Sequence, residues 1–289
     1  SSSGDPTPPA EPSARSAPAM SAKSALDQAI RAARSGDLAG AAGAARQAVE
    51  LDPKMERAYL LWGSACEQQG DLQCSMDAYQ RGLEALPRSA ELLRERGLLR
   101  LQQGDASGAV SDLERALDTV EAPETRADLA FAYLFAGQPE RAQQASLESV
   151  QAAPECFLCW MARAEVLTQL ERHREAEAAY AEALRITPND PDALAGRAKA
   201  RFRAGDAAGS SEIFERLVQR IPDDPRLRVQ AAQAAMAAEF PGRAVRHLER
   251  VVRDNPDNVE LLQFLLRARE AAGDADGARR ARERLKALQ

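Results

Sequence analysis

Four cysteines in two local pairs are the residues of this 289-residue sequence whose spacing most clearly suggests chemistry. Cys66 and Cys74 are eight positions apart, and Cys156 and Cys159 form a C-x-x-C sequence. Pairs at such spacings can form disulfides, bind zinc or provide a reactive thiol. Two disulfides would indicate an oxidising compartment, whereas free cysteines are good small core residues.

Other residues with catalytic potential do not form a recognisable constellation. The only two histidines, His173 and His247, fall at different places in the repeat described below, so we do not expect them to share a site. The sequence contains no G-x-S-x-G, H-E-x-x-H, G-x-x-x-x-G-K-S/T or G-x-G-x-x-G string. We therefore expect no enzyme activity, no metal and no cofactor, and we assign both histidines to helix surfaces.

Prolines and glycines recur along the chain at a nearly constant interval. Six prolines lie 34, 67, 34, 34 and 34 residues apart: Pro53, Pro87, Pro154, Pro188, Pro222 and Pro256. Six glycines keep the same period: Gly36, Gly70, Gly104, Gly137, Gly205 and Gly273. Aspartate follows most of these glycines, a pattern that ends one helix in a left-handed cap and begins the next with an N-cap. Each period therefore predicts two helices joined by a tight turn.

This register places the cysteines relative to the predicted helices. Cys66 falls in a first helix and Cys74 in the following second helix, each four residues from Gly70, so the turn brings them together. Cys156 and Cys159 fall at the start of a helix, where the spacing can close a bridge or favour a thiolate. A shared zinc site would need all four sulfurs ~2.3 Å from one ion. Several helices, packed ~8 to 10 Å apart, separate the two pairs, so this register excludes such a site. A thioredoxin-like redox role would need a strand–helix–strand setting that is absent. Disulfides and free core thiols remain the alternatives.

The repeat resembles the tetratricopeptide-repeat family, in which small residues face each other across a helical hairpin and a proline closes it. Trp62-Gly63, Tyr79 and Pro87 carry this pattern in the second repeat. The resemblance implies an all-α, right-handed superhelical solenoid of about eight helix-turn-helix repeats over residues 21–289. The repeats are expected to start near residues 22, 56, 90, 123, 157, 191, 225 and 259. Residues 1–20, rich in proline, serine and alanine, are predicted to be a disordered tether.

In this family the first helices of the hairpins line a concave groove, so the resemblance also predicts a binding surface. An exposed apolar patch usually marks an interaction site, and an amphipathic helix or an extended apolar peptide would fit it. An alternative is that some of these side chains pack between neighbouring hairpins. The groove residues are predicted to be Leu98, Leu101, Phe131, Leu134, Phe135, Leu158, Met161, Phe202, Val229 and Met236. The only asparagines, Asn189, Asn255 and Asn258, fall in or beside the inter-repeat turns, so we expect no carboxylate clamp.

The charge distribution argues against nucleic acid as the partner. The net charge is −6 with both signs interspersed, so no basic stripe suggests nucleic acid. A start without methionine, the tether and the paired cysteines resemble a bacterial outer-membrane lipoprotein of the pilotin or assembly-factor type. The resemblance implies a periplasmic protein, held to the outer membrane by a lipid anchor preceding residue 1, that binds an apolar or helical segment of a secretion or pilus component. The alternative is a cytoplasmic adaptor or co-chaperone-like protein.

Overall fold

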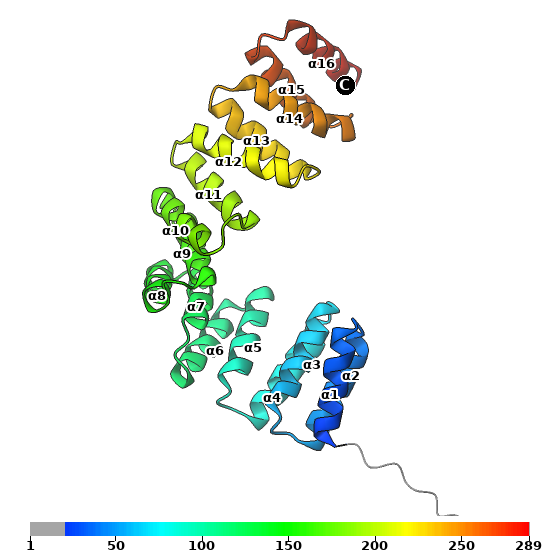
Figure 1. Ribbon diagram of the computed structural model, residues 1–289, viewed down its shortest axis with the longest axis vertical. Coiled ribbons are helices and arrows are strands. Elements are labelled where there is room, and N and C mark those ends of the chain that lie inside the picture. Colours follow the sequence, from blue (N-terminus) through cyan, green and yellow to red (C-terminus); the bar gives the residue numbers. More distant parts are fainter. Residues whose placement is uncertain (1–20, 289) are drawn as a thin grey trace, which may run out of the picture. The chain divides into compact units, whose positions relative to one another are not determined.

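The computed structural model describes residues 21–288, which form sixteen α-helices and contain no strand (Figure 1). The helices alternate as first and second members of eight hairpins. The first helices are α1 (Ala22–Arg34), α3 (Glu56–Gln68), α5 (Ala90–Gln102), α7 (Pro123–Phe135), α9 (Phe157–Gln169), α11 (Pro191–Arg203), α13 (Pro225–Ala237) and α15 (Val259–Ala271). The second helices are α2 (Leu38–Leu51), α4 (Leu72–Ala85), α6 (Ala106–Thr119), α8 (Pro139–Ala152), α10 (His173–Ile186), α12 (Ala207–Arg220), α14 (Pro241–Asp254) and α16 (Ala275–Ala287).

The all-α repeat architecture predicted from the sequence is confirmed. The tether predicted for residues 1–20 lies outside the described residues. No helix between residues 21 and 288 combines the length and the apolar character needed to cross a membrane.

In five of the eight hairpins of residues 21–288, the turn has the geometry that the glycine–aspartate pattern predicts. Gly36 has a φ of 79°, in the left-handed region where a side chain is unfavourable, and the Asp37 carboxylate then accepts from the backbone N–H of Gly40 at 2.9 Å. Two hairpins place glutamate at the left-handed position instead. Glu171 has a φ of 58° and Glu239 a φ of 62°. These two turns therefore hold a conformation that costs free energy for a residue with a side chain.

Replacing Glu239 by glycine is expected to stabilise the fold. Removing the side chain relieves the left-handed strain, but glycine also gives the unfolded chain more conformational freedom. We expect a net increase of about 1 kcal/mol in the free energy of unfolding. Urea unfolding followed by circular dichroism measures the difference. Glu239→Ala is the matched variant, because it removes the carboxylate but keeps the Cβ, and it should give no comparable gain. Equal stability of Glu239→Gly and the parent chain would contradict the prediction.

The chain divides into two units, with the boundary inside α5 between Leu99 and Arg100. The regular repeat of the sequence gives no sign of this division. In unit 1, which ends at Leu99, α1 packs against α2, α2 against α3 and α3 against α4, and α1 also contacts α3. The first hairpin has a core of alanines, with Ala25, Ala29 and Ala41 fully buried. Since alanine buries little apolar area, this hairpin gains less from burial than the ones that follow.

Unit 2 begins at Arg100 and contains α6 to α16. Consecutive helices pack together, and α9 also contacts the neighbouring first helices α7 and α11. The buried ring of Tyr180 on α10 packs against Gly196 on α11, where an added Cβ would lie 2.3 Å from the ring carbon Cζ. The Tyr180 hydroxyl donates to a carboxylate oxygen of Glu165 on α9. One side chain thus joins three helices.

Candidate functional site

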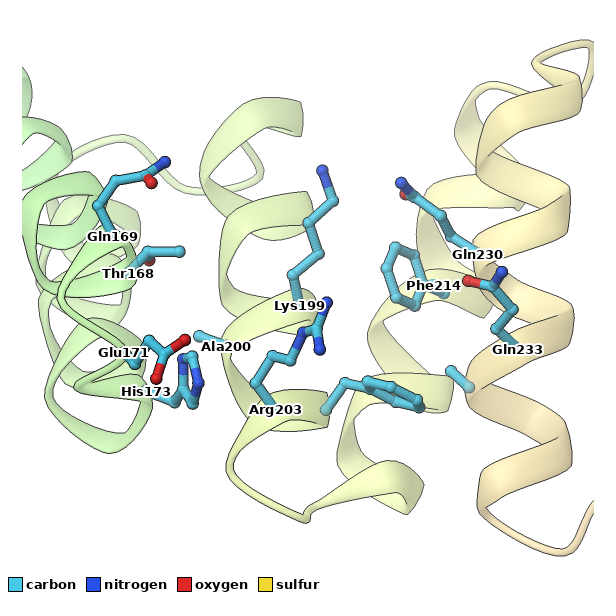
Figure 2. Close-up of a pocket in the computed structure, with 12 residues that line it drawn as sticks. Thr168, Gln169, Glu171, His173, Lys199, Ala200, Arg203, Phe214, Gln230 and Gln233 are labelled. Atoms are coloured by element: carbon cyan, nitrogen blue, oxygen red, sulfur yellow. The ribbon is translucent and has the colours of Figure 1, made fainter. Parts of the chain in front are cut away.

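A cavity of about 530 Å³ opens on the side of unit 2 formed by the first helices α9, α11 and α13 (Figure 2). It crosses three consecutive hairpins. Its lining consists of Thr168, Gln169, Glu171, His173, Lys199, Ala200, Phe202, Arg203, Phe214, Gln230, Gln233 and Ala234. Because most of these residues come from first helices, the cavity lies on the groove side that the sequence analysis predicted to bind a partner.

Helical periodicity explains why α11 supplies three neighbouring functional groups. Lys199, Phe202 and Arg203 are spaced i, i+3 and i+4, so they share one face of the helix. Gln230 and Gln233 share a face of α13 by the same rule. Figure 2 shows Lys199 and Arg203 rising from α11 in the space between Gln169 and the two glutamines of α13. Charged and amide groups therefore converge on the middle of the cavity.

The two cations of the cavity are available to a ligand. Within residues 21–288, neither Lys199 nor Arg203 forms an ion pair, although Arg201 on the same helix pairs with Glu177 and Asp206. An unpaired lysine and arginine offer up to eight N–H donors between them, and glutamine amides can both donate and accept. This arrangement can bind a carboxylate and the backbone of an extended peptide.

The end of the cavity near Ala200 contains the left-handed residue Glu171 and the first residue of α10, His173 (Figure 2). The Nδ1 atom of His173 is buried and has no hydrogen-bond partner. A buried polar atom without a partner is uncommon in a folded protein, because its desolvation is not compensated. This end of the cavity can therefore accept a further polar group from a ligand.

An ion cluster holds α11 in place beside the cavity. The Glu177 carboxylate on α10 accepts from Nε of Arg197 at 2.8 Å and from Nε of Arg201 at 3.0 Å. Burial alone would raise the pKa of Glu177, but the two arginine hydrogen bonds and charges outweigh it and lower that pKa below its usual range. The cluster thus stabilises the ionised form of Glu177 in the folded protein.

Acid is expected to weaken this contact between α10 and α11. Because the pKa of Glu177 is lower in the folded than in the unfolded chain, its contribution to stability is complete above the unfolded pKa of ~4.3 and is lost as pH falls through the folded pKa. Glu177→Gln should cost about 1 kcal/mol at neutral pH and should flatten the decline of unfolding free energy below pH ~4.3. Urea unfolding at a series of pH values tests this, and parallel curves for both proteins would contradict it.

Comparison with models of known protein families identifies the family of this chain. A family model described as "Tetratricopeptide repeat" matches residues 26–90, 76–124, 128–191 and 229–287, and a second model with the same description matches residues 167–236. The chain belongs to the tetratricopeptide-repeat family. Proteins of this family serve as scaffolds for protein interaction, and the cavity lies on the first helices of three of its repeats.

Individual relatives extend this result. Bacteriophage adsorption protein A of Escherichia coli (strain K12) is 32% identical over 127 residues, which are 44% of this chain and only 12% of that protein. A tetratricopeptide-repeat protein from Parabacteroides merdae ATCC 43184 aligns at 18% identity and a TM-score of 0.62 over 84% of this chain and 97% of that one. PilW, a widely conserved type IV pilus biogenesis factor, aligns at 19% identity and a TM-score of 0.65 over 72% and 97%. At these identities the solved structures share the fold alone.

The ten residues predicted for the groove are placed on first helices, and none of them is fully buried. Phe135, Leu158 and Phe202 are the most exposed, at 73%, 58% and 36%. The half-buried members are Leu98 in unit 1 and, in unit 2, Leu101, Phe131, Leu134, Met161, Val229 and Met236. Several of these, including Leu134 and Met161, also contact the core between hairpins. The structure therefore contains both the exposed surface and the inter-hairpin packing that the sequence left open.

Of these ten residues, Phe202 lines the cavity between α9, α11 and α13, while Val229 lines a neighbouring hollow between α13 and α15. The residues predicted for the groove are all apolar, so they do not include Lys199, Arg203, Gln230 and Gln233. The signal was present, because Lys199 and Arg203 share a helix face with Phe202. Applying the helical period to polar residues as well would have found them.

The cysteines and histidines fall in different settings. Both pairs are disulfides, Cys66–Cys74 with Cα atoms 5.7 Å apart and Cys156–Cys159 with Cα atoms 5.3 Å apart. The assignment of both histidines to helix surfaces is wrong for His247, which is buried with its Nε2 atom 2.9 Å from Glu215. Within the described part of the chain, no group of three or more His, Cys, Asp or Glu side chains is arranged to hold a metal ion.

Proposed function

We propose that this protein is an interaction scaffold whose unit 2 binds a segment of another protein along α9, α11 and α13. The observation that carries the proposal is the cavity on three consecutive first helices, with unpaired cations and converging amides at its centre. A site assembled from three hairpins suits an elongated ligand, because each hairpin contributes one part of a continuous track. Membership of the tetratricopeptide-repeat family supports the same conclusion.

The chemistry of the lining defines the partner more closely. Lys199 and Arg203 favour an acidic side chain, and the glutamines on α9 and α13 can bond to peptide groups. Phe202 adds an apolar surface within the cavity. Leu158 at the beginning of α9 and Phe135 at the end of α7 are further exposed apolar side chains on first helices of unit 2. We infer an amphipathic segment in which at least one acidic residue lies beside apolar ones. The proposed partner is thus the apolar or helical segment expected from the sequence, with an acidic residue as an additional requirement.

A role in assembling structures of the bacterial cell envelope is the more specific part of the proposal. Two disulfides favour an oxidising compartment. The names of the similar proteins, a bacteriophage adsorption protein and a type IV pilus biogenesis factor, agree with a location at the envelope. We propose a periplasmic assembly factor, attached to the outer membrane by a lipid anchor, that binds a secretion or pilus component. A cytoplasmic adaptor is the alternative outcome.

The compartment can be tested by the oxidation state of the cysteines in the source cells. Rapid acid quenching followed by a maleimide–polyethylene glycol reagent shifts a protein on a gel according to its free thiols. An envelope protein should show no modification before reduction and four modified thiols after it. Modification of all four cysteines without added reductant would favour the cytoplasmic adaptor.

The binding site can be tested with a phage-displayed library of random peptides. Selection on the full chain should enrich peptides that combine acidic and apolar residues. Phe202→Asp places a charge in the apolar part of the cavity and should abolish the enrichment. Phe240→Asp is a matched control, because Phe240 is an aromatic residue of similar exposure, 39% against 36%, outside the cavity lining.

The outcome separates the proposed site from other surfaces. Equal enrichment by the Phe202→Asp and Phe240→Asp proteins would show that peptides bind elsewhere on the chain. Phe135→Asp extends the test to α7, since the exposed Phe135 ring belongs to the predicted apolar surface but lies outside the cavity. A loss of enrichment in Phe135→Asp as well would show that the ligand reaches the neighbouring hairpin.

A further inference from the structure

The Cys156–Cys159 disulfide lies at the beginning of α9, where Cys156 is the N-cap residue. Its Sγ atom accepts a hydrogen bond from the backbone N–H of Cys159 at 3.1 Å. In the next two first helices, α11 and α13, the N-cap residues are Asp190 and Asp224, whose carboxylates accept the equivalent bonds. The sulfur of Cys156 therefore occupies a position where the next two repeats place a negative charge.

A helix N-terminus at this position favours the thiolate form of Cys156 over the thiol. The unpaired N–H groups and the positive end of the helix dipole stabilise an anion in the first turn. The adjacent Glu155 carboxylate is paired with the Arg185 guanidinium at 2.9 Å, which reduces its repulsion of a thiolate. Cysteines with a stabilised thiolate are good leaving groups in thiol–disulfide exchange.

The two sulfurs differ in access. Cys159 is fully buried in a cluster with Ala127, Val150 and Ala162, whereas Cys156 is only partly buried. An attacking thiolate can reach Cys156 but not Cys159. Leu158, which lies between the two cysteines in sequence, is 58% exposed and offers an apolar contact for an approaching protein.

The Cys66–Cys74 disulfide has a different environment. The N-cap of α4 is Asp71, whose carboxylate accepts from the backbone N–H of Cys74 at 3.0 Å. That carboxylate already accepts the hydrogen bond at the N-terminus of α4, and its negative charge disfavours a thiolate at Cys74. The indole N–H of Trp62 also donates to the Cys74 sulfur at 3.3 Å, in a tightly packed hairpin. These features suit a bond that joins α3 to α4 permanently.

We propose that Cys156–Cys159 is a thiol–disulfide exchange site that oxidises a dithiol of a bound protein, while Cys66–Cys74 is structural. A partner thiolate attacks Sγ of Cys156, the bond to Cys159 breaks, and Cys159 leaves as a thiolate that takes up a proton. The second partner thiol, after losing its proton, attacks the partner sulfur of the mixed disulfide, and Cys156 leaves as the thiolate held by the helix N-terminus. Each chain thus transfers the Cys156–Cys159 disulfide and accepts two electrons.

This site does not need the strand–helix–strand setting whose absence argued against a redox role in the sequence. The requirements are a helix N-terminus without a competing carboxylate cap, one accessible sulfur and one buried sulfur. The first follows from cysteine at the N-cap of α9, and the other two follow from the packing of α9 against its neighbours.

The two disulfides of the full oxidised chain can be compared in one experiment. The protein is incubated with reduced glutathione, quenched with N-ethylmaleimide and analysed by peptide mass spectrometry. We expect the equilibrium constant for reduction of Cys156–Cys159 to exceed that of Cys66–Cys74 by at least about tenfold, with glutathione attached to Cys156 in the intermediate. Reduction of Cys66–Cys74 first, or of both pairs at equal concentrations, would overturn the proposal.

A synthetic peptide with two cysteines tests transfer to a dithiol. Oxidised protein should convert up to one equivalent of the reduced peptide to its disulfide, and the variant with Cys66→Ser and Cys74→Ser should do the same. The variant with Cys156→Ser and Cys159→Ser should not. No oxidation by the parent chain would show that the Cys156–Cys159 bond is structural. Peptide oxidation by this last variant would show that Cys66–Cys74 exchanges, and either result would overturn the proposal.

Discussion

Replacing both Lys199 and Arg203 by glutamate is expected to reduce the affinity for acidic peptides at least about tenfold. The parent cavity presents two cations without ion-pair partners, and the double variant presents two carboxylates beside Glu171. An acidic ligand group then meets repulsion instead of a charge-assisted hydrogen bond. Fluorescence anisotropy with a peptide selected from the phage library measures the change.

The control variant for this charge reversal is Arg216→Glu with Arg253→Glu. Both arginines are exposed on second helices, α12 and α14, outside the cavity between α9, α11 and α13. The control changes the net charge by the same amount, so it reports the long-range effect of charge alone, which added salt should screen. Similar affinities for the two double variants would show that the cavity cations do not contact the ligand.

Replacing Tyr180 by alanine is expected to cost unit 2 about 3–5 kcal/mol of unfolding free energy. The ring is almost completely buried among Ala164, Leu167 and Ala200, and its removal leaves a void between α9, α10 and α11. Burial, together with the hydrogen bond to Glu165, raises the pKa of Tyr180 well above its usual range, so the hydroxyl remains a donor. Urea unfolding followed by circular dichroism measures the loss.

Tyr180→Phe separates the hydrogen bond from the packing. It keeps the ring but removes the donor to Glu165, and it should cost only about 1 kcal/mol. Because Tyr180 packs behind Ala200 in the cavity wall, the alanine variant should also weaken peptide binding, whereas the phenylalanine variant should not. Losses of equal size in both variants would mean that the ring contributes little to holding the three helices together.

The repeat architecture could be predicted from short-range features of the sequence. A glycine followed by aspartate specifies a left-handed cap and the start of the next helix, as Gly36 and Asp37 show. The same period placed Cys66 and Cys74 on facing helices, because eight residues around a tight turn bring the chain back on itself. Where the glycine is replaced, as at Glu171 and Glu239, the neighbouring helices hold the turn in the same conformation.

The candidate site could be predicted only in part. The helical register assigned Phe202, Leu158 and Phe135 to first helices with exposed side chains, as the structure shows. It did not show that Lys199 and Arg203 lack ion-pair partners while the nearby Arg201 is paired. That difference depends on the direction in which each side chain leaves α11, toward the cavity or toward Glu177 on α10.

The sequence by itself determined the family, the helix pairs and the local cysteine pairs, because all of these depend on contacts between residues close together in the chain. Only the tertiary structure determined which charges stay unpaired, which sulfur of Cys156–Cys159 is accessible, and that His247 is buried. These properties depend on the packing of side chains from different hairpins. The repeat period fixes where a helix lies but not the partner that each of its side chains meets.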